Sequence, residues 1–393
     1  METTLFYNCQ LFDGKNPQIQ PHSWFLVNPA GQINARGQGT TPPAEHRVDL
    51  HNQYVMPGLI NCHTHLCLDP DAFDGDTGTD KVTATVRAVQ NAQTMLRSGV
   101  TYVRECGSIK GVDITLSQLI EQQKLTHVPQ ILPAVLPFSM TGGHGSLNNG
   151  TQEVDSPDEM RQAVRQALKQ GAQVIKVMAT GGVMSPADFM NDPQLSTAEM
   201  RAAVLEAHHR QKTVAAHAEG NPGILNAIEA GVDSIEHGFY VNDAEIDLML
   251  KQHTFLTPTF IAAWAIPRFG QGILPNWEIK KAADALDDLY QNINHAYQRQ
   301  VPITLGTDAG TCFNYFDQTP KELELMVDHG FSNFDALQTS WHSAQLMQIA
   351  EHYGTLEEQK FADFLVLTHN PLEDIRAVQQ VNKQVYQKGN RVA

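Results

Sequence analysis

The sequence predicts an α/β protein in which a TIM-like (β/α)₈ barrel is joined to a small β-sandwich formed by both chain termini. Three observations lead to this fold class. After Gly58, apolar strand-like runs alternate with helix-patterned segments through eight units. Before Gly58, and again near the C-terminus, short alternating strands and turn residues replace that rhythm. The segment HTHLCLDPD, at the end of the first barrel strand, lacks the G-x-G-x-x-G that a nucleotide-binding open sheet would place there.

The two parts are expected to divide the chain unequally. Residues 1–57 plus 353–393 are predicted to form the small β-sandwich domain, and residues 58–352 the barrel. The first segment contains the strand-like runs TLFYNCQLF, WFLVNPAGQINARG and EHRVDLHNQYVMPG. The tail from KFADFLVLTHN onward returns to the same character, so its strands are expected to pair with those of the N-terminal segment.

The barrel elements follow in a regular order, and this alternation implies parallel strands joined by right-handed crossovers. The link after the seventh strand, 260–277, is rich in aromatic residues and is expected to be a loop that forms a lid, a pocket wall or a subunit contact. The expected strand and helix pairs are GLINCHTHLCL with 80–98, TYVRECG with 113–124, QILPAVLPF with 156–170, QVIKVMATGG with 197–211, TVAAHAEG with 222–230, VDSIEHGF with 242–252, TFLTPTF with 278–300, and PITLGTDAG with 320–328 and 334–349.

Composition excludes several classes of protein. The chain has 393 residues, with 27 Lys+Arg against 43 Asp+Glu and a net charge of −16, which argues against nucleic acid as a partner. No apolar run reaches the roughly 18 residues of a membrane span, and the N-terminus lacks the features of a signal peptide. We therefore expect a cytoplasmic enzyme.

Polar side chains fall at the C-terminal ends of the predicted barrel strands, where barrels of this type carry their chemistry. His63 and His65 end the first strand, and residues i and i+2 of a strand face the same way. One such histidine is usually a hydrogen-bonded core residue, and one such aspartate usually caps the next helix. A whole set in strand order instead favours a metal site. The remaining members, on strands four, five, six and eight, are Lys176, His217, His237 and Asp308.

Imidazole and carboxylate ligands without thiolates suit Zn²⁺, with Mn²⁺, Co²⁺ or Fe²⁺ as alternatives. Two such ions, roughly 3.5–4 Å apart, can hold a bridging water as hydroxide that attacks a carbonyl group. Asp308 would take the proton of that water and pass it to the leaving nitrogen. Lys176, in an apolar strand, would act as a base, as a Schiff-base former, or as a carbamate made with CO₂ that bridges the ions.

The pattern MPGLINCHTHL, VIKVMATGG, AAHAEG, SIEHG and GTDAG resembles the amidohydrolase superfamily over nearly the whole chain. The resemblance implies a (β/α)₈ barrel, a β-sandwich made of both termini and a binuclear metal centre. It further implies that His63, His65 and Asp308 hold one ion and that His217 and His237 hold the other. Lys176, carried as a carbamate, would bridge them.

Two further segments, IKVMATGGVMSP and SMTGGHGS, look like the branch of Xaa-Pro dipeptidases and related metallocarboxypeptidases. In that branch the residues matching His144 and Tyr240 contact the substrate's C-terminal carboxylate or the scissile carbonyl. Arg104, at the end of the second strand, is a weaker candidate for the same carboxylate, with a structural salt bridge as its other role.

The sequence thus predicts a metal-dependent hydrolase of C–N bonds that acts on small molecules or dipeptides with a free C-terminal carboxylate. Xaa-Pro and Xaa-hydrophobic dipeptides are the leading substrates, and N-acyl amino acids are a further class. Two alternatives remain: a cyclic amidohydrolase similar to imidazolonepropionase, and a non-catalytic barrel used for binding. Because barrels of this kind frequently pair through their outer helices, a homo-oligomer is also considered.

Overall fold

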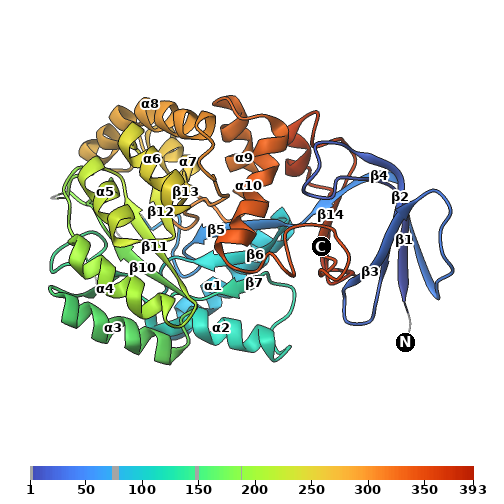
Figure 1. The fold of residues 1–393 in the computed structure, drawn as a ribbon, viewed down its shortest axis with the longest axis horizontal. Helices are drawn as coiled ribbons and strands as arrows, with labels where there is room; N and C mark the ends of the chain where they lie inside the picture. The colour runs from blue at the N-terminus through green and yellow to red at the C-terminus, as the bar shows by residue number, and fades with distance from the viewer. Residues whose placement is uncertain (1–2, 73–78, 147–149, 187) are drawn as a thin grey trace.

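The computed structural model describes residues 3–72, 79–146, 150–186 and 188–393 of the chain. A barrel surrounded by helices fills one side of the molecule, and a smaller β unit lies beside it (Figure 1). The two chain termini both lie at the smaller unit. This arrangement agrees with the predicted fold class.

The smaller unit is a seven-stranded sheet to which both ends of the chain contribute. Strand β4 is the junction, because it pairs in parallel with β1 and antiparallel with β14. The order β16-β15-β14-β4-β1-β2-β3 is made by β1 (Thr4–Leu11), β2 (Gln20–Val27), β3 (Ile33–Gln38), β4 (His46–Pro57), β14 (Phe364–Leu367), β15 (Gln384–Gln387) and β16 (Asn390–Arg391).

This sheet is curled so that its two halves face each other. In a flat sheet β1 and β15 would be three strand spacings apart, or about 14 Å. The ring centroids of Phe6 on β1 and Tyr386 on β15 are instead 5.5 Å apart. Phe25 and Phe364 complete a buried aromatic cluster with them. The expected sandwich is therefore made by one folded sheet.

The barrel strands pair in parallel, in two sheets with the orders β5-β6-β7 and β13-β12-β11-β10-β8-β9. Their helices lie on the outside (Figure 1). The strands are β5 (Leu59–Thr64), β6 (Val100–Glu105), β7 (Gln130–Leu132), β8 (Phe138–Ser139), β9 (Gln152–Glu153), β10 (Val174–Met178), β11 (Thr213–Ala218), β12 (Ser234–His237) and β13 (Phe255–Thr257). The helices are α1 (Lys81–Ser98), α2 (Val112–Glu121), α3 (Pro157–Gln170), α4 (Thr197–His208), α5 (Asn221–Ala230), α6 (Asp243–Gln252), α7 (Phe260–Phe269), α8 (Asn276–Gln298), α9 (Thr319–Asp328) and α10 (Asn333–Leu346).

The predicted eighth strand is irregular, although it still joins its neighbours. Its backbone forms hydrogen bonds with the strands on both sides, β13 and β5. Leu256 N–H donates to the Pro302 carbonyl (3.1 Å), and Cys62 N–H donates to the Leu305 carbonyl (2.8 Å). At Gly306 the backbone packs closely against its neighbours, because a Cβ atom there would lie 2.4 Å from Thr257 Cγ2. Asp308, two residues later, lines the mouth of the barrel.

Helix boundaries follow the punctuation of the sequence closely. Ser196 and Asn242 form capping boxes with glutamates three residues later, at the starts of α4 and α6.

The prediction for 260–277 as a loop is wrong in its first half, because residues 260–269 form α7 despite Pro267 near its end. Phe260 and Ile261 N–H groups donate to the Glu322 carboxylate, which satisfies the first turn of that helix.

Among the described residues, no helix is both long and apolar enough to cross a bilayer. The cytoplasmic location expected from the sequence stays a prediction.

Truncating Phe364 to alanine is expected to destabilise the protein by about 3–5 kcal/mol, because the fully buried ring would leave a cavity in the aromatic cluster of the curled sheet. Denaturant unfolding followed by tryptophan fluorescence would measure the change. As a control, Val381→Ala alters a fully exposed side chain and should stay within about 0.5 kcal/mol of the wild type. A similar loss in both variants would contradict the assignment of the cluster as a packing core.

Candidate metal centre

The six predicted ligands meet at one cavity of about 390 Å³ at the C-terminal ends of the barrel strands. They come from five different segments: β5, β10, β11, β12 and the irregular segment after α8. The cavity is large enough for a small substrate. The residues concerned are His63, His65, Lys176, His217, His237 and Asp308.

Three of these residues form a tight donor group. His63 Nε2 lies 3.3 Å and His65 Nε2 lies 3.1 Å from Asp308 Oδ1. Their ligand atoms lie within 4.8 Å of one another, close enough to hold one metal ion. Two imidazoles and a carboxylate suit a divalent ion such as Zn²⁺.

The Nδ1 atoms of His63 and His65, on the side of each ring away from Asp308, are held by hydrogen bonds. His63 Nδ1 lies 2.7 Å from Glu236 Oε2, and His65 Nδ1 lies 3.2 Å from the Gly107 carbonyl oxygen. Because these oxygens accept hydrogen bonds, each Nδ1 carries a proton, and each Nε2 faces Asp308, where a metal ion would take the place of the proton between them. The predicted pair of ligands is therefore fixed in the orientation that metal binding needs.

His217 and His237 form a second group beside the first. Their ring centroids are 4.7 Å apart, and the His237 ring is 5.1 Å from that of His63. His217 Nε2 faces the Gly181 carbonyl oxygen at 3.1 Å, and His237 Nδ1 faces Thr259 Oγ1 at 2.8 Å. This leaves Nδ1 of His217 and Nε2 of His237 for a ligand. Burial lowers the pKa of both imidazoles well below the ordinary value, which favours the neutral form that binds metals.

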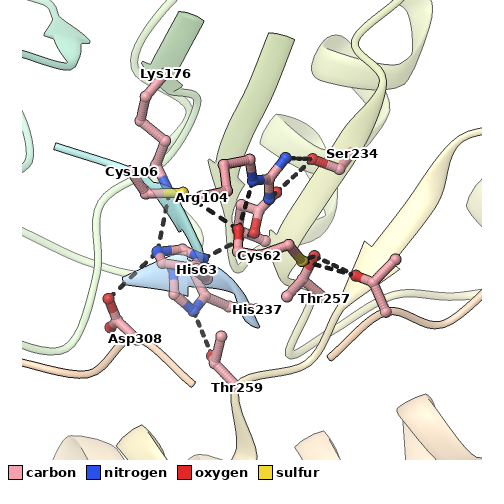
Figure 2. Close-up of polar contacts among 12 residues, drawn as sticks. Cys62, His63, Arg104, Cys106, Lys176, Ser234, His237, Thr257, Thr259 and Asp308 are labelled. Carbon is pink, nitrogen blue, oxygen red and sulfur yellow. Dashed lines mark hydrogen bonds and ion pairs between the residues drawn. The ribbon is translucent and has the colours of Figure 1, made fainter. Parts of the chain in front are cut away.

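Lys176 lies between the two groups. Its side chain is almost fully buried, and its Nζ is 3.3 Å from His63 Nε2 (Figure 2). Strand β10 places it there, next to β11, which carries His217. The position fits the predicted bridging role, and the carbamate itself stays a prediction.

Three residues at this mouth have left-handed backbone conformations that non-glycine residues rarely adopt. The φ angles are 74° at His237, 61° at Asp308 and 48° at Thr259. Such conformations cost energy and persist where the surrounding structure imposes them, commonly at functional sites. They indicate that the barrel holds these side chains in place against a local preference.

Asp308 is ready to act as an anion. Burial alone would raise the pKa of its carboxyl, but the neighbouring His63 and His65 outweigh burial and hold the pKa well below the ordinary value. Its carboxylate therefore stays ionised, as both a metal ligand and a proton acceptor require.

Arg104, the weaker candidate for substrate contact, forms the structural salt bridge that was its other expected role. Its side chain is fully buried and donates to Glu236 Oε1 (2.7 Å), to Ser234 Oγ (3.1 Å) and to the Cys62 carbonyl (Figure 2). Although burial would raise the pKa of Glu236, Arg104 holds it well below the ordinary value. The structural salt bridge, the other role considered for Arg104, is what the structure contains. Glu236, which the sequence analysis did not single out, thus links Arg104 to His63.

A second group, of His63, Cys106 and Glu236, is also compact enough to hold a metal ion. Burial raises the pKa of the Cys106 thiol to about 12, so the thiolate that metals prefer is disfavoured. Glu236 is already bonded to Arg104 and His63. The group containing Asp308 is the better site.

His144 lines the cavity where it was predicted to meet a substrate. Its ring stacks on that of His217 at 4.2 Å, and its Nδ1 lies 2.7 Å from Asp188 Oδ2. Asp188, in the loop after β10, carried no signal in the sequence. For Tyr240 the contact stays a prediction, because the adjacent Phe239 is the residue that lines the cavity.

The segment 260–277 forms part of the cavity wall, one of the roles expected for it. Its lining residues are Ala262, Ala263, Ile266, Pro275 and Trp277. From α8, Lys281 Nζ donates to the carbonyls of Gly182, Ser185 and Asp188, so it ties the loop after β10 to this wall. No pattern in the sequence marks this lysine, since a lysine on a surface helix is usually solvated.

Comparison with known proteins identifies the family of the chain. The model of the amidohydrolase family matches residues 54–392. The chain belongs to this family. Among solved structures, it superposes on a Xaa-Pro dipeptidase with methionine bound in its active site, with a TM-score of 0.92 and 31% identity over 99% of both chains.

Two curated relatives of this amidohydrolase are not named as dipeptidases. The chain is 29% identical to an ochratoxinase of Aspergillus niger, over 85% of this chain and 73% of that protein. It is 26% identical to an imidazolonepropionase of Erwinia tasmaniensis, over 84% of this chain and 81% of that protein. The family therefore fixes hydrolysis of amide bonds as the type of reaction.

Replacing Glu236 with glutamine is expected to weaken metal binding by about 10- to 100-fold, because the carboxylate that holds the Nδ1 proton of His63 is lost. Titration of the apoprotein with Zn²⁺, followed by elemental analysis, would measure this. The exposed Glu229 on α5 offers a control, since Glu229→Gln should leave the affinity unchanged. Unaltered binding in the Glu236 variant would show that His63 needs no support from beneath.

Proposed function

We propose that this amidohydrolase is a binuclear metal-dependent hydrolase of small substrates with a free C-terminal carboxylate, with dipeptides as the leading class. The observation that carries the proposal is the meeting of two donor groups on one cavity, with Lys176 between them. One group would be His63, His65 and Asp308, and the other His217 and His237. Zn²⁺ is the first choice of ion, with Mn²⁺, Co²⁺ or Fe²⁺ as alternatives.

A divalent ion bound there would supply Lewis-acid chemistry, lowering the pKa of water and polarising a carbonyl group. The remaining steps fall to the chain. Asp308 would accept the proton of the attacking water at its carboxylate and deliver it to the leaving nitrogen. The apolar walls and the long α7–α8 segment would exclude bulk water from the reacting atoms.

The proposal places the substrate's C-terminal carboxylate at His144. Asp188 orients this imidazole by binding Nδ1, and no described residue bonds Nε2, so that nitrogen is free for a ligand. The likeness to a Xaa-Pro dipeptidase supports a dipeptide with proline or a hydrophobic residue last. The likeness to an ochratoxinase keeps N-acyl amino acids in the set to be tested.

A cyclic amide is the second candidate substrate, supported by the relative named imidazolonepropionase. It would use the same ligands and the same base, so the substrate class alone separates the two. The expectations of no nucleic-acid partner and of a homo-oligomer stay predictions.

Release of amino acid from a panel of Xaa-Pro, Xaa-hydrophobic, Xaa-Arg/Lys and N-acyl substrates tests the proposal. Protein loaded with Zn²⁺ or Mn²⁺ should cleave at least one class, and removal of the metal with a chelator should abolish turnover. Liquid chromatography of the released amino acid gives the rates. A metal-loaded protein that leaves the whole panel intact but opens an imidazolone ring would replace the dipeptide with the cyclic amide.

Substituting Asp308 with asparagine is expected to lower kcat by about 10²- to 10⁴-fold, since an amide cannot accept the proton. Metal content must be measured on the same sample, because Asp308 is also a predicted ligand. Asp317→Asn, an exposed change in the same segment, is the control for loss of charge. Full turnover in the Asp308 variant would remove it from the reaction.

A further inference from the structure

The cavity contains carboxylates that the metal centre does not use. Glu219 follows β11, two residues after His217, and Glu278 lies in the first turn of α8. Both line the cavity, and both are at least nine-tenths buried. They were not singled out by the sequence analysis.

One carboxylate oxygen of Glu219 lacks a hydrogen-bond donor among the described residues. Its Oε2 is buried and has no hydrogen-bond partner among the described residues. Its Oε1 is 3.9 Å from His217 Nε2, which faces the Gly181 carbonyl oxygen at 3.1 Å. A buried acceptor without a donor is costly and rare in folded proteins, so this oxygen calls for a partner from outside the chain.

The nearby Lys281 does not supply that partner. Lys281 Nζ has three protons, and three backbone carbonyls of the loop after β10 take them. No ion pair within 4 Å joins it to Glu219 among the described residues, although four carboxyl groups, those of Asp188, Glu219, Glu278 and Asp192, interact electrostatically with it. Carboxyl groups therefore outnumber this lysine at this corner of the cavity.

We propose that Glu219 binds the α-ammonium group of a dipeptide substrate, and so makes the enzyme prefer dipeptides to N-acyl amino acids; this inference rests on the proposed function. In a dipeptide a single carbon atom separates the α-nitrogen from the scissile carbonyl. When that carbonyl is at the metal centre, the ammonium must lie beside it, and Glu219 adjoins the centre at His217. An ammonium group offers three donors, one of which meets Oε2. An N-acyl substrate would leave this oxygen unpaired.

The corner also fits the direction of the substrate. Glu219 and His144 both line the cavity, and the proposed function assigns the carboxyl end of the substrate to His144. The amino end lies on the other side of the scissile carbonyl, so it is left for Glu219.

The test compares Ala-Xaa with propionyl-Xaa, where Xaa is the residue that the panel favours. These substrates share the scissile bond and differ only in the α-amino group. For Glu219→Gln, kcat/KM for Ala-Xaa should fall about 10- to 100-fold, while kcat/KM for propionyl-Xaa stays within about 3-fold of the wild type. Glu278→Gln is the matched control, because it removes a second buried carboxylate that also faces Lys281.

Each other result overturns the inference. Equal losses on both substrates, with less metal by elemental analysis, would make Glu219 part of the metal site. Equal losses of Ala-Xaa turnover in the Glu219 and Glu278 variants would show that the total negative charge of the cavity, and not a contact with Glu219, favours the ammonium group. No change in the Glu219 variant, with Ala-Xaa still cleaved, would reject the ammonium contact and keep the proposed function. A metal-loaded wild type that cleaves neither substrate would reject both.

Discussion

The buried ion pair between Arg104 and Glu236 supports the metal site from below. Both side chains are fully excluded from solvent, and the Glu236 carboxylate is divided between Arg104 on one oxygen and His63 on the other. Removing one member of a buried pair costs about 3–5 kcal/mol, because the remaining charge has no partner. The ion pair is therefore a fixed charged unit inside the barrel, and it sets the direction of His63 Nε2 by binding Nδ1.

The strand ends add a second constraint, because the site needs backbone conformations that these residues do not prefer. Left-handed residues such as His237, Asp308 and Thr259 cost of order 1–3 kcal/mol each. The compensation is shared: Thr259 Oγ1 bonds His237, while His63 and His65 both contact Asp308. Strain and hydrogen bonding together hold the donor atoms at distances that one ion can bridge.

Sequence patterning predicted that the six candidate ligands would meet at one cavity, because two simple rules are enough for that placement. Strand alternation determines which side chains share a face, and chain order determines which strand ends gather at one mouth. Neither rule predicts which residue the end of a long side chain contacts. The guanidinium of Arg104 is buried against Glu236 and does not line the cavity. The pairing of His144 with Asp188 joins residues 44 positions apart, and Lys281 reaches a carbonyl 93 positions away. Such contacts depend on loop conformations that have no period in the sequence, and α7 was missed as a helix for the same lack of pattern.

Residues at strand ends determine the type of reaction, whereas residues in loops determine which substrate fits. The metal-binding atoms belong to residues at strand ends and to Asp308, which lies two residues after the closely packed Gly306. His144, Asp188 and the apolar wall depend instead on the loop after β10, which Lys281 holds by three carbonyl bonds. A change in that loop would move the carboxylate contact and reshape the wall together, while leaving the metal ligands in place. Relatives with different names, such as an ochratoxinase and an imidazolonepropionase, are the expected consequence of this construction.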